Sequence, residues 1–239
     1  FAAVLRTLDL KNGKVLLPAY IGWSPREGSG VFDPIEALGL KYSFYALDDR
    51  LQIDLDSVNR ELQAGGVRVF VIIHYFGYVD PSYAEAIQLA REHGAFVIED
   101  AAHAMLTDLV GNRCGKLGDA CLYSFHKMLP VETGGAAIFN DPSSPLLERI
   151  QHDPAAAALS CGFDLTAISA RRRAIASRLD EFVRGCAPEI EPLFGMPPDG
   201  EVPQTYPVVI RNGSRDQVYH EMNNAGFGVV SLYHTLISQ

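Results

Sequence analysis

The stretch Val97-Ile98-Glu99-Asp100-Ala101-Ala102-His103 decides how this chain folds. Its first residues are apolar and suit a short strand, which ends in two acidic residues, and two alanines then lead to an imidazole. A second run, residues 68–74, is rich in β-branched residues and suits a strand buried on both faces. The sequence therefore predicts an α/β fold, with a mixed, mostly parallel sheet, helices on both faces and reactive groups at the strand ends.

The alternation of helices and strands continues along the chain and then changes character. Helices are predicted over residues 1–10, 56–64 and 82–93, and strands over 14–19, 42–47, 68–74, 95–99, 119–125 and 135–139. Beyond them we expect a long helix over 165–186, a proline-rich loop over 187–203, strands over 205–211 and 227–232, and a helix over 216–225. This change predicts a large domain over residues 1–165 and a smaller C-terminal α+β domain over residues 166–239.

A lysine follows the predicted strand 119–125 in the stretch Tyr123-Ser124-Phe125-His126-Lys127-Met128-Leu129-Pro130-Val131-Glu132-Thr133-Gly134-Gly135. An amine that can hold an aldehyde as a Schiff base and a carboxylate that keeps a ring nitrogen protonated together suit pyridoxal 5'-phosphate. The sequence thus predicts Lys127 as the catalytic amine and Asp100 as the partner of the ring nitrogen. The alternatives are a surface lysine on a loop and an aspartate that caps a helix N-terminus.

The ordered motifs resemble the DegT/DnrJ family of sugar aminotransferases, which are pyridoxal phosphate enzymes of fold type I. The resemblance rests on Glu99 to His103, Gly118-Asp119, Ser124-Phe125, Lys127 and Gly134-Gly135, and it extends upstream to the segments 15–20 and 71–77. The family's spacing from the serine to the lysine is longer than here, whereas the spacing from the lysine to the glycine pair agrees. We therefore anchor Lys127 on the glycines, and His126 and Lys116 are the rival positions.

The resemblance also implies roles for other side chains. It places His103 near the ring hydroxyl of the cofactor, Ser124 on the phosphate, and an aromatic side chain, for which we expect Trp23, against the ring face. A structural histidine, a strand-end hydrogen bond and a buried core aromatic are the respective alternatives, with Tyr20 as the rival for stacking. His74 and Tyr75 suit either the substrate side or ordinary packing at the end of their strand.

Composition excludes several classes of function. The net charge of −9 argues against a nucleic-acid partner, and the one basic run, Arg171-Arg172-Arg173, suits a solvated helix face or a partner contact better than a phosphate site. No apolar run is long enough to span a membrane. Cys114, Cys121, Cys161 and Cys186 lack metal-binding spacing, so we expect no metal and reduced, buried thiols. A cytoplasmic location is the expectation.

The family resemblance implies an aminotransferase that moves an amino group from an amino acid, glutamate being the implied donor, to a nucleotide-linked keto sugar, as in polysaccharide biosynthesis. It also implies a homodimer, and it indicates that both predicted domains are incomplete in this chain. Two alternatives stay open. One is a pyridoxal phosphate-dependent sugar dehydratase, and the other is a truncated relative without catalytic activity.

Overall fold

A six-stranded sheet forms the centre of the computed structural model, which describes residues 1–10, 12–23, 28–150, 162–186, 188–233 and 236–237. The strands are β1 (Lys14–Pro18), β2 (Lys41–Tyr45), β3 (Val67–Ile73), β4 (Phe96–Asp100), β5 (Ala120–Ser124) and β6 (Gly135–Phe139). Their order is β2-β1-β3-β4-β5-β6, with β1 to β5 parallel and β6 antiparallel to β5. The predicted mixed, mostly parallel sheet is confirmed.

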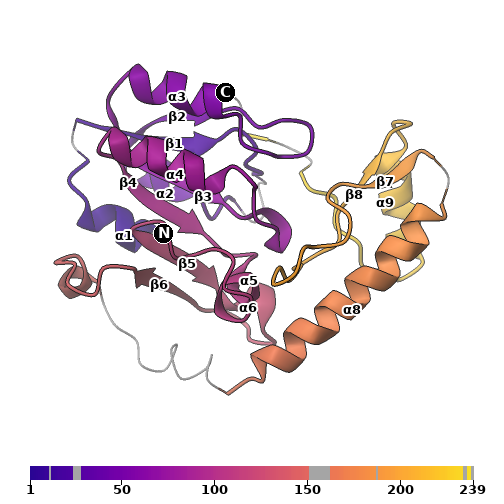
Figure 1. Cartoon of the computed structure of the whole chain (residues 1–239). Helices are drawn as coiled ribbons and strands as arrows, with labels where there is room; N and C mark the ends of the chain where they lie inside the picture. Colours follow the sequence, from indigo (N-terminus) through magenta and orange to yellow (C-terminus); the bar gives the residue numbers. More distant parts are fainter. Residues whose placement is uncertain (11, 24–27, 151–161, 187, 234–235, 238–239) are drawn as a thin grey trace.

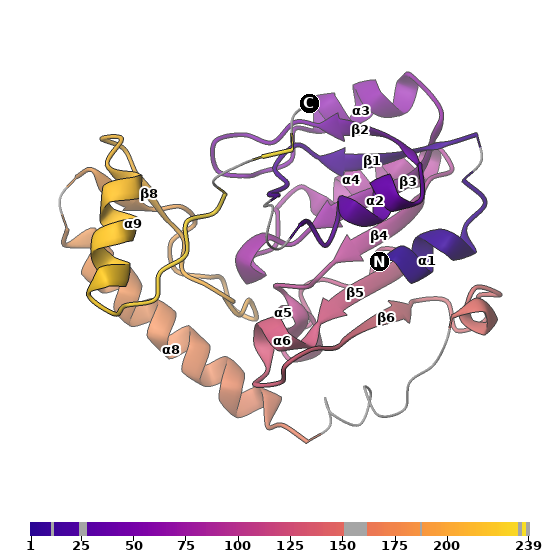
Figure 2. The same ribbon diagram turned by 180° about the vertical axis from the view of Figure 1, so that it is seen from behind.

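Helices cover both faces of the sheet (Figures 1 and 2). One face carries α3 (Leu55–Gln63) and α4 (Tyr83–Glu92), and the other carries α1 (Ala2–Thr7) and α2 (Asp33–Ala37). Because side chains alternate along a strand, β3 sends Phe70 and Ile72 to the first face and Val69 and Val71 to the second, and all four are buried. This double burial accounts for the continuous apolar run that the sequence shows there.

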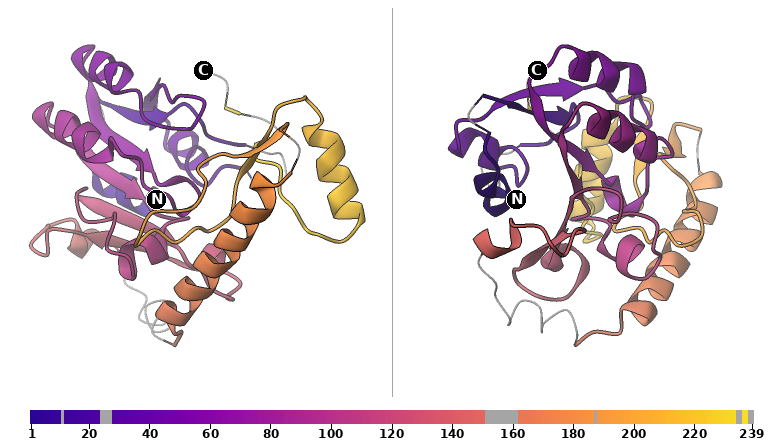
Figure 3. Two further views of the ribbon diagram at one scale, coloured as in Figure 1. Left: turned by 45° about the vertical axis from the view of Figure 1, so that its right-hand side comes forward. Right: turned by 60° about the vertical axis from the view of Figure 1, so that its left-hand side comes forward.

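A long helix leads away from the sheet to a smaller group of elements (Figure 3). This helix, α8 (Leu165–Arg184), is followed by β7 (Ile190–Pro192), β8 (Val208–Ile210) and α9 (Arg215–Asn224), and β7 pairs with β8 antiparallel. The chain then returns to the sheet, where the amide of Ile237 donates to the carbonyl of Ile21 at 2.9 Å. The division of the chain into two domains near residue 165, where α8 begins, stays a prediction.

Two sequence predictions for the C-terminal part are wrong. Residues 227–232 form no strand, because this apolar segment has no partner strand among the described residues, and Phe227 and Val230 stay 71% and 69% exposed. The predicted loop 187–203 contains β7, and its later residues pack on the main body, with Val202 buried beside Met105 and Leu106. Strand propensity alone does not make a strand where no edge is available for pairing.

Several short elements were not predicted. They are α2, α5 (Met105–Leu109), α6 (Phe125–Met128) and the 3₁₀ turns η1 (Tyr75–Gly77) and η2 (Leu147–Arg149). Each has five residues or fewer, too few to display a helical period in the sequence. Two of them, η1 and α6, directly follow the carboxyl ends of β3 and β5 and so shape the edge of the sheet where ligands bind in such folds.

Candidate active site

Lys127 lies on α6, a single helical turn directly after β5. The helix forms because Phe125 and Met128, three residues apart, both bury their side chains in one apolar cluster. His126 and Lys127 between them are then exposed. Lys127 therefore lies in a helical turn and not on a loop, as the alternative had it, although its side chain is exposed.

The glycine pair holds the start of this turn. Ser124 pairs with Gly135 across β5 and β6, and the Phe125 amide donates to the carbonyl of Gly134 at 2.9 Å. A Cβ on Gly135 would lie 2.5 Å from the Tyr123 carbonyl oxygen, and Gly134 has a φ of +119°. Side chains at these positions would push β6 away from β5, so the two glycines fix where Lys127 begins its helical turn.

Lys127 and His103 meet at the ends of two neighbouring strands. The Lys127 Nζ lies 3.1 Å from the His103 Nε2, although the two residues come from the segments after β5 and β4. Burial lowers the pKa of His103 to about 3, and the nearby Lys127 amine acts in the same direction. The imidazole is therefore neutral at neutral pH. Two of the predicted site residues are brought into contact.

Phe76 contributes to this contact, and sequence reasoning missed it. Its amide lies 3.3 Å from the His103 Nδ1, and its ring stacks on the imidazole with centroids 5.8 Å apart and an interplanar angle of 13°. Phe76 has a φ of 59°, a left-handed conformation that is uncommon for a large side chain. No pattern in the sequence signals that conformation, because it arises from packing within η1.

Asp100 ends β4 and is only half-buried. Its Oδ1 accepts a hydrogen bond from the Ala102 amide at 2.9 Å. The next helix, α5, begins at Met105 with Ala104 as its N-cap, so the alternative that Asp100 caps a helix is wrong. Within the described part of the chain the second carboxylate oxygen accepts no hydrogen bond. As far as the described residues go, one oxygen of Asp100 can still accept a hydrogen bond.

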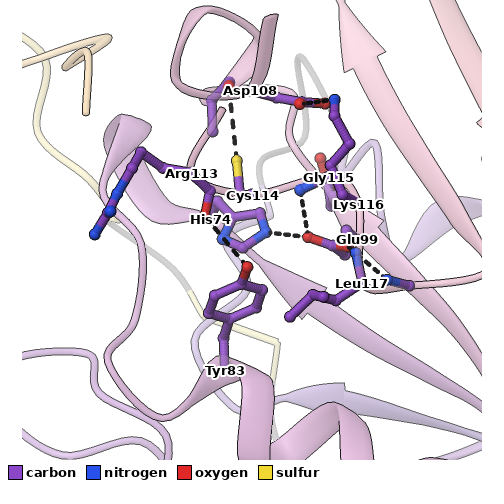
Figure 4. Close-up of polar contacts among 12 residues, drawn as sticks. His74, Tyr83, Glu99, Asp108, Arg113, Cys114, Gly115, Lys116 and Leu117 are labelled. Atoms are coloured by element: carbon purple, nitrogen blue, oxygen red, sulfur yellow. Dashed lines mark hydrogen bonds and ion pairs between the residues drawn. The ribbon is translucent and has the colours of Figure 1, made fainter. Parts of the chain in front are cut away.

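Glu99, the preceding residue, points to the opposite side of β4 and is completely buried (Figure 4). It accepts hydrogen bonds from His74 Nε2 at 2.9 Å and from the amides of Gly115, Leu117 and Gly118 at 2.6, 2.9 and 2.6 Å. Burial alone would raise the pKa of Glu99, but the bonds from His74 and these amides outweigh burial and lower it. His74 is thus committed to packing rather than to a substrate.

Lys116, the rival lysine, is exposed and lies beside the buried cluster around Glu99 (Figure 4). Its amine forms an ion pair with Asp108, and the hydroxyl of Tyr123 donates to the same carboxylate. Asp108 is 1% exposed, so its charge is balanced by these two partners. Lys116 is engaged in this pair, whereas Lys127 meets an imidazole.

The remaining predicted positions are less closely tied to this contact. The Ser124 Oγ lies 3.3 Å from the His126 Nδ1, which joins the serine to the rival histidine rather than to Lys127. Trp23 is 39% exposed, so the alternative of a buried core aromatic is wrong. Tyr20 packs against Tyr75 and Tyr233, with ring centroids 5.7 and 5.1 Å away. A role for Ser124 or Trp23 in binding the cofactor stays a prediction.

The basic run on α8 joins that helix to the site region. Arg172 donates to the carbonyl oxygens of Gln204 at 2.9 Å and of Met128 at 3.4 Å, and Arg173 donates to those of Pro198 and Glu201 at 2.6 Å. The prediction of a solvated face is therefore wrong for these two arginines. Because Met128 follows Lys127, Arg172 ties the end of α6 to α8.

The cysteines, possible metal ligands and possible membrane spans were also considered in the sequence predictions. Cys114 and Cys121 are buried free thiols and Cys186 is a half-buried one, while Cys161 lies outside the described residues. Among the residues that the structure describes, no three metal-ligating side chains come together. Nor does any described helix combine the length and the apolar character needed to cross a membrane.

The residues present fit pyridoxal phosphate. Lys127 supplies an exposed primary amine, and Asp100 supplies a carboxylate oxygen to which no described residue donates, which is the acceptor that a protonated ring nitrogen requires. His103 and Ser124 stand at the ends of the same two strands. These groups occupy the carboxyl edge of the parallel sheet, where open α/β sheets bind their ligands.

Parts of this chain are similar in sequence to known proteins. The chain is 32% identical over 152 residues to a UDP-4-amino-4-deoxy-L-arabinose--oxoglutarate aminotransferase from Shewanella sediminis, a match that covers 62% of this chain and 36% of that protein. It is 32% identical over 117 residues to a dTDP-4-dehydro-2,3,6-trideoxy-D-glucose 4-aminotransferase from Saccharopolyspora spinosa, covering 48% of this chain and 30% of that one. The matches thus span about a third of these relatives' lengths.

Solved structures show the same fold over nearly the whole chain. The aminotransferase TlmJ from Streptoalloteichus hindustanus superposes with a TM-score of 0.70 at 22% identity, covering 94% of this chain and 68% of that one. At the level of sequence, the model of the DegT/DnrJ/EryC1/StrS aminotransferase family matches residues 4–152, which is more than half of the chain. The chain therefore belongs to the DegT/DnrJ/EryC1/StrS aminotransferase family.

Proposed function

We propose that the whole protein is a pyridoxal phosphate-dependent aminotransferase, which moves an amino group from an amino acid, with glutamate as the donor, to a nucleotide-linked keto sugar. The observation that carries the proposal is the Lys127 amine at 3.1 Å from His103, with Asp100 at the carboxyl end of the neighbouring strand β4, in a chain of this family. The names of the two relatives described above, which are nucleotide-sugar aminotransferases, support the substrate class.

Each residue has a distinct task in this proposal. When bound, pyridoxal phosphate supplies an electron sink that stabilises negative charge on a substrate carbon. Lys127 holds the cofactor and then, through its free Nζ, moves a proton at that carbon. Asp100 keeps the ring nitrogen protonated through its available oxygen, Ser124 donates its hydroxyl to the phosphate, and Trp23 covers a ring face. The predicted division at residue 165, the homodimer and the cytoplasmic location belong to the same proposal.

The test uses the full-length protein saturated with pyridoxal phosphate. We expect glutamate alone to convert the cofactor to its amine form, which is followed by absorbance, and one member of a panel of nucleotide-linked keto sugars to reverse the change. No response to any amino donor would overturn amino transfer. Water loss from a sugar substrate without that half-reaction would favour the dehydratase alternative, and failure to bind the cofactor at all would favour a non-catalytic relative.

A further inference from the structure

Arg172 of α8 contacts two separate chain segments with one guanidinium group. Its Nη1 donates to the Gln204 carbonyl at 2.9 Å, and its Nη2 donates to the Met128 carbonyl at 3.4 Å. The planar fork of an arginine can bind two acceptors at once, which the compact ammonium group of a lysine does less well. The side chain therefore joins the end of α6 to the segment that follows β7.

Each of these carbonyls is linked to one partner of the contact between Lys127 and His103. Met128 directly follows Lys127 and is the last residue of α6. The Gln204 amide donates to the Phe76 carbonyl at 2.7 Å, and the Phe76 ring stacks on the His103 imidazole. A closed ring of contacts thus runs from the guanidinium through both site residues and back, and it joins the segments after β3, β4 and β5 to α8.

Apolar packing holds α8 against the same turn. Leu165 and Ile168 pack on the cluster that contains Met128 and Leu129. Arg172 follows these two residues at positions i, i+3 and i+7, so it lies on the same face of the helix. The arginine is therefore kept near α6 by the packing of its own helix as well as by its hydrogen bonds.

The Arg172 guanidinium is half-buried and, within the described part of the chain, forms no ion pair. Burial lowers its pKa, and no neighbouring charge acts against this. A cation that is withdrawn from water without a counter-ion is costly unless other polar groups replace the solvent. Here backbone carbonyls do so. The adjacent Arg173 differs, because it pairs with the Asp199 carboxylate at 3.2 Å.

We infer that Arg172 is a positioning residue for Lys127, because its fork holds the end of α6 and the turn at Phe76 in the arrangement that places the amine beside His103. The helix α6 has four residues, and so short a helix needs tertiary contacts to form. The inference deepens the proposed function and rests on it for the identity of Lys127 as the reacting amine.

Hydrogen exchange of single amides, measured by NMR in the cofactor-free full-length protein, tests whether Arg172 holds the turn. The Leu129 amide donates to the Phe125 carbonyl at 2.7 Å and so reports on whether α6 is closed. We expect Arg172→Met to speed the exchange of this amide about tenfold, because hydrogen bonds from charged donors are among the stronger ones. Exchange at the wild-type rate would overturn the inference.

Arg173→Met is the matched control, because Arg173 also donates to two carbonyls, those of Pro198 and Glu201. This variant should speed the exchange of the Glu201 amide, which donates to the Pro198 carbonyl. The exchange of the Leu129 amide should stay within about twofold of the wild-type rate. Equal effects of the two variants on Leu129 would show a general loosening of α8 and would contradict the inference.

The rate at which pyridoxal phosphate attaches to Lys127 tests the consequence for the amine. Absorbance follows this rate in the same proteins, and borohydride reduction with mass spectrometry establishes the lysine that is modified. We expect attachment about tenfold slower in Arg172→Met, unchanged in Arg173→Met and intermediate in Arg172→Lys, which keeps the charge but not the fork. A merely structural role would lower the stability of both methionine variants without separating their attachment rates.

The outcomes separate this inference from the proposed function. Attachment to Lys127 at the wild-type rate in a folded Arg172→Met protein would overturn the inference and leave the proposed function in place. If Arg172→Met does not fold, Arg172→Lys takes its place, and a wild-type rate in that variant would overturn the inference. A wild-type protein that attaches no pyridoxal phosphate would overturn the proposed function, and the exchange of the Leu129 amide would still decide whether Arg172 holds the turn.

Discussion

Glu99 and Asp100 are neighbours on one strand, but they differ in burial and in the number of hydrogen bonds that their carboxylates accept. Glu99 is fully buried and receives four hydrogen bonds, from His74 and three backbone amides. Asp100 is half-buried and receives one, from Ala102. Successive side chains of a strand point to opposite faces. Glu99 therefore lies on the side with the filled, buried polar cluster, which we call the closed side, and Asp100 lies on the other side, which we call the open side.

The difference shows how to tell a structural carboxylate from one that serves a ligand. A buried charge is tolerated only when its hydrogen-bonding capacity is filled, and Glu99 meets that condition. A carboxylate that is to bind something else must keep capacity in reserve, as Asp100 does. The two exposed lysines differ in their partners, because Lys116 is paired with the buried Asp108, whereas Lys127 contacts the His103 imidazole.

The largest expected effect follows from removing the amine on the open side. We expect Lys127→Ala to reduce amino transfer by about 10³-fold or more, since it removes both the attachment point of the cofactor and a proton carrier. The free energy of unfolding should change by less than about 0.5 kcal/mol, because the side chain is exposed. Steady-state kinetics and urea unfolding measure the two quantities.

Lys116→Ala is the matched control for Lys127→Ala. It should retain the absorbance of the bound cofactor while lowering stability, because the buried Asp108 loses its ion-pair partner. The reverse pattern, with activity lost in Lys116→Ala and kept in Lys127→Ala, would exchange the roles of the two lysines.

The next largest effect should come from the closed side. Glu99→Gln keeps the size of the side chain but places an amide N–H₂ among donors that need acceptors, so we expect a loss of about 3 kcal/mol of unfolding free energy. Urea unfolding of the cofactor-free protein gives this value. A loss below about 1 kcal/mol would show that the cluster in Figure 4 is not as tightly coupled as its hydrogen bonds indicate.

Asp100→Asn should give the opposite profile. The asparagine Oδ1 can still accept from the Ala102 amide, so stability should change by less than about 1 kcal/mol. Amino transfer should fall by about 10²-fold, because a neutral amide holds a protonated ring nitrogen poorly. Comparison of kinetics with urea unfolding checks the split, and a variant with normal activity would remove Asp100 from the site.

The smallest effect concerns the dependence of stability on pH. The pKa of His103 is about 3 in the folded state and ordinarily about 6.5, so the unfolded chain binds a proton in that interval while the folded chain does not. Stability should therefore fall as the pH drops from about 6.5 toward 3. The unfolding free energy of His103→Gln should fall less steeply with falling pH, and its slope should differ from that of the wild type by about 1 kcal/mol per pH unit or less. The lowered pKa of Glu99 contributes equally in both proteins.

Urea unfolding at several pH values between 6.5 and 4 measures these slopes. Parallel curves for wild type and His103→Gln would show that His103 titrates as it does in the unfolded chain. If the unfolding free energy of the variant fell more steeply with falling pH than that of the wild type, His103 would contribute to the pH dependence with the opposite sign.

The strands of the sheet could be predicted from the sequence, whereas the environments of the two acidic residues could not, for a physical reason. The buried strands carry their own signal, because the run over β3 is apolar on both faces and the acidic pair after Ile98 marks a strand end. What the sequence does not encode locally is which of two adjacent acids faces the site. That choice depends on the partners of Glu99, which come from the segments 115–118 and His74.

The parts that prediction missed depend on contacts between distant segments. The left-handed conformation of Phe76 is braced by Gln204 and Thr107, far along the chain. The helical turn at Lys127 follows from the joint burial of Phe125 and Met128. In contrast, the apolar segment 227–232 carries a strand pattern and stays without a partner, so pattern alone overstated the second sheet.

The most direct test of the account is to locate the covalent attachment of the cofactor. The full-length protein loaded with pyridoxal phosphate is reduced with borohydride, digested and analysed by mass spectrometry. We expect the cofactor's mass on the peptide that contains Lys127, and on no peptide that contains Lys116. Attachment at Lys116 or another lysine, or no attachment in a protein that binds the cofactor, would contradict it.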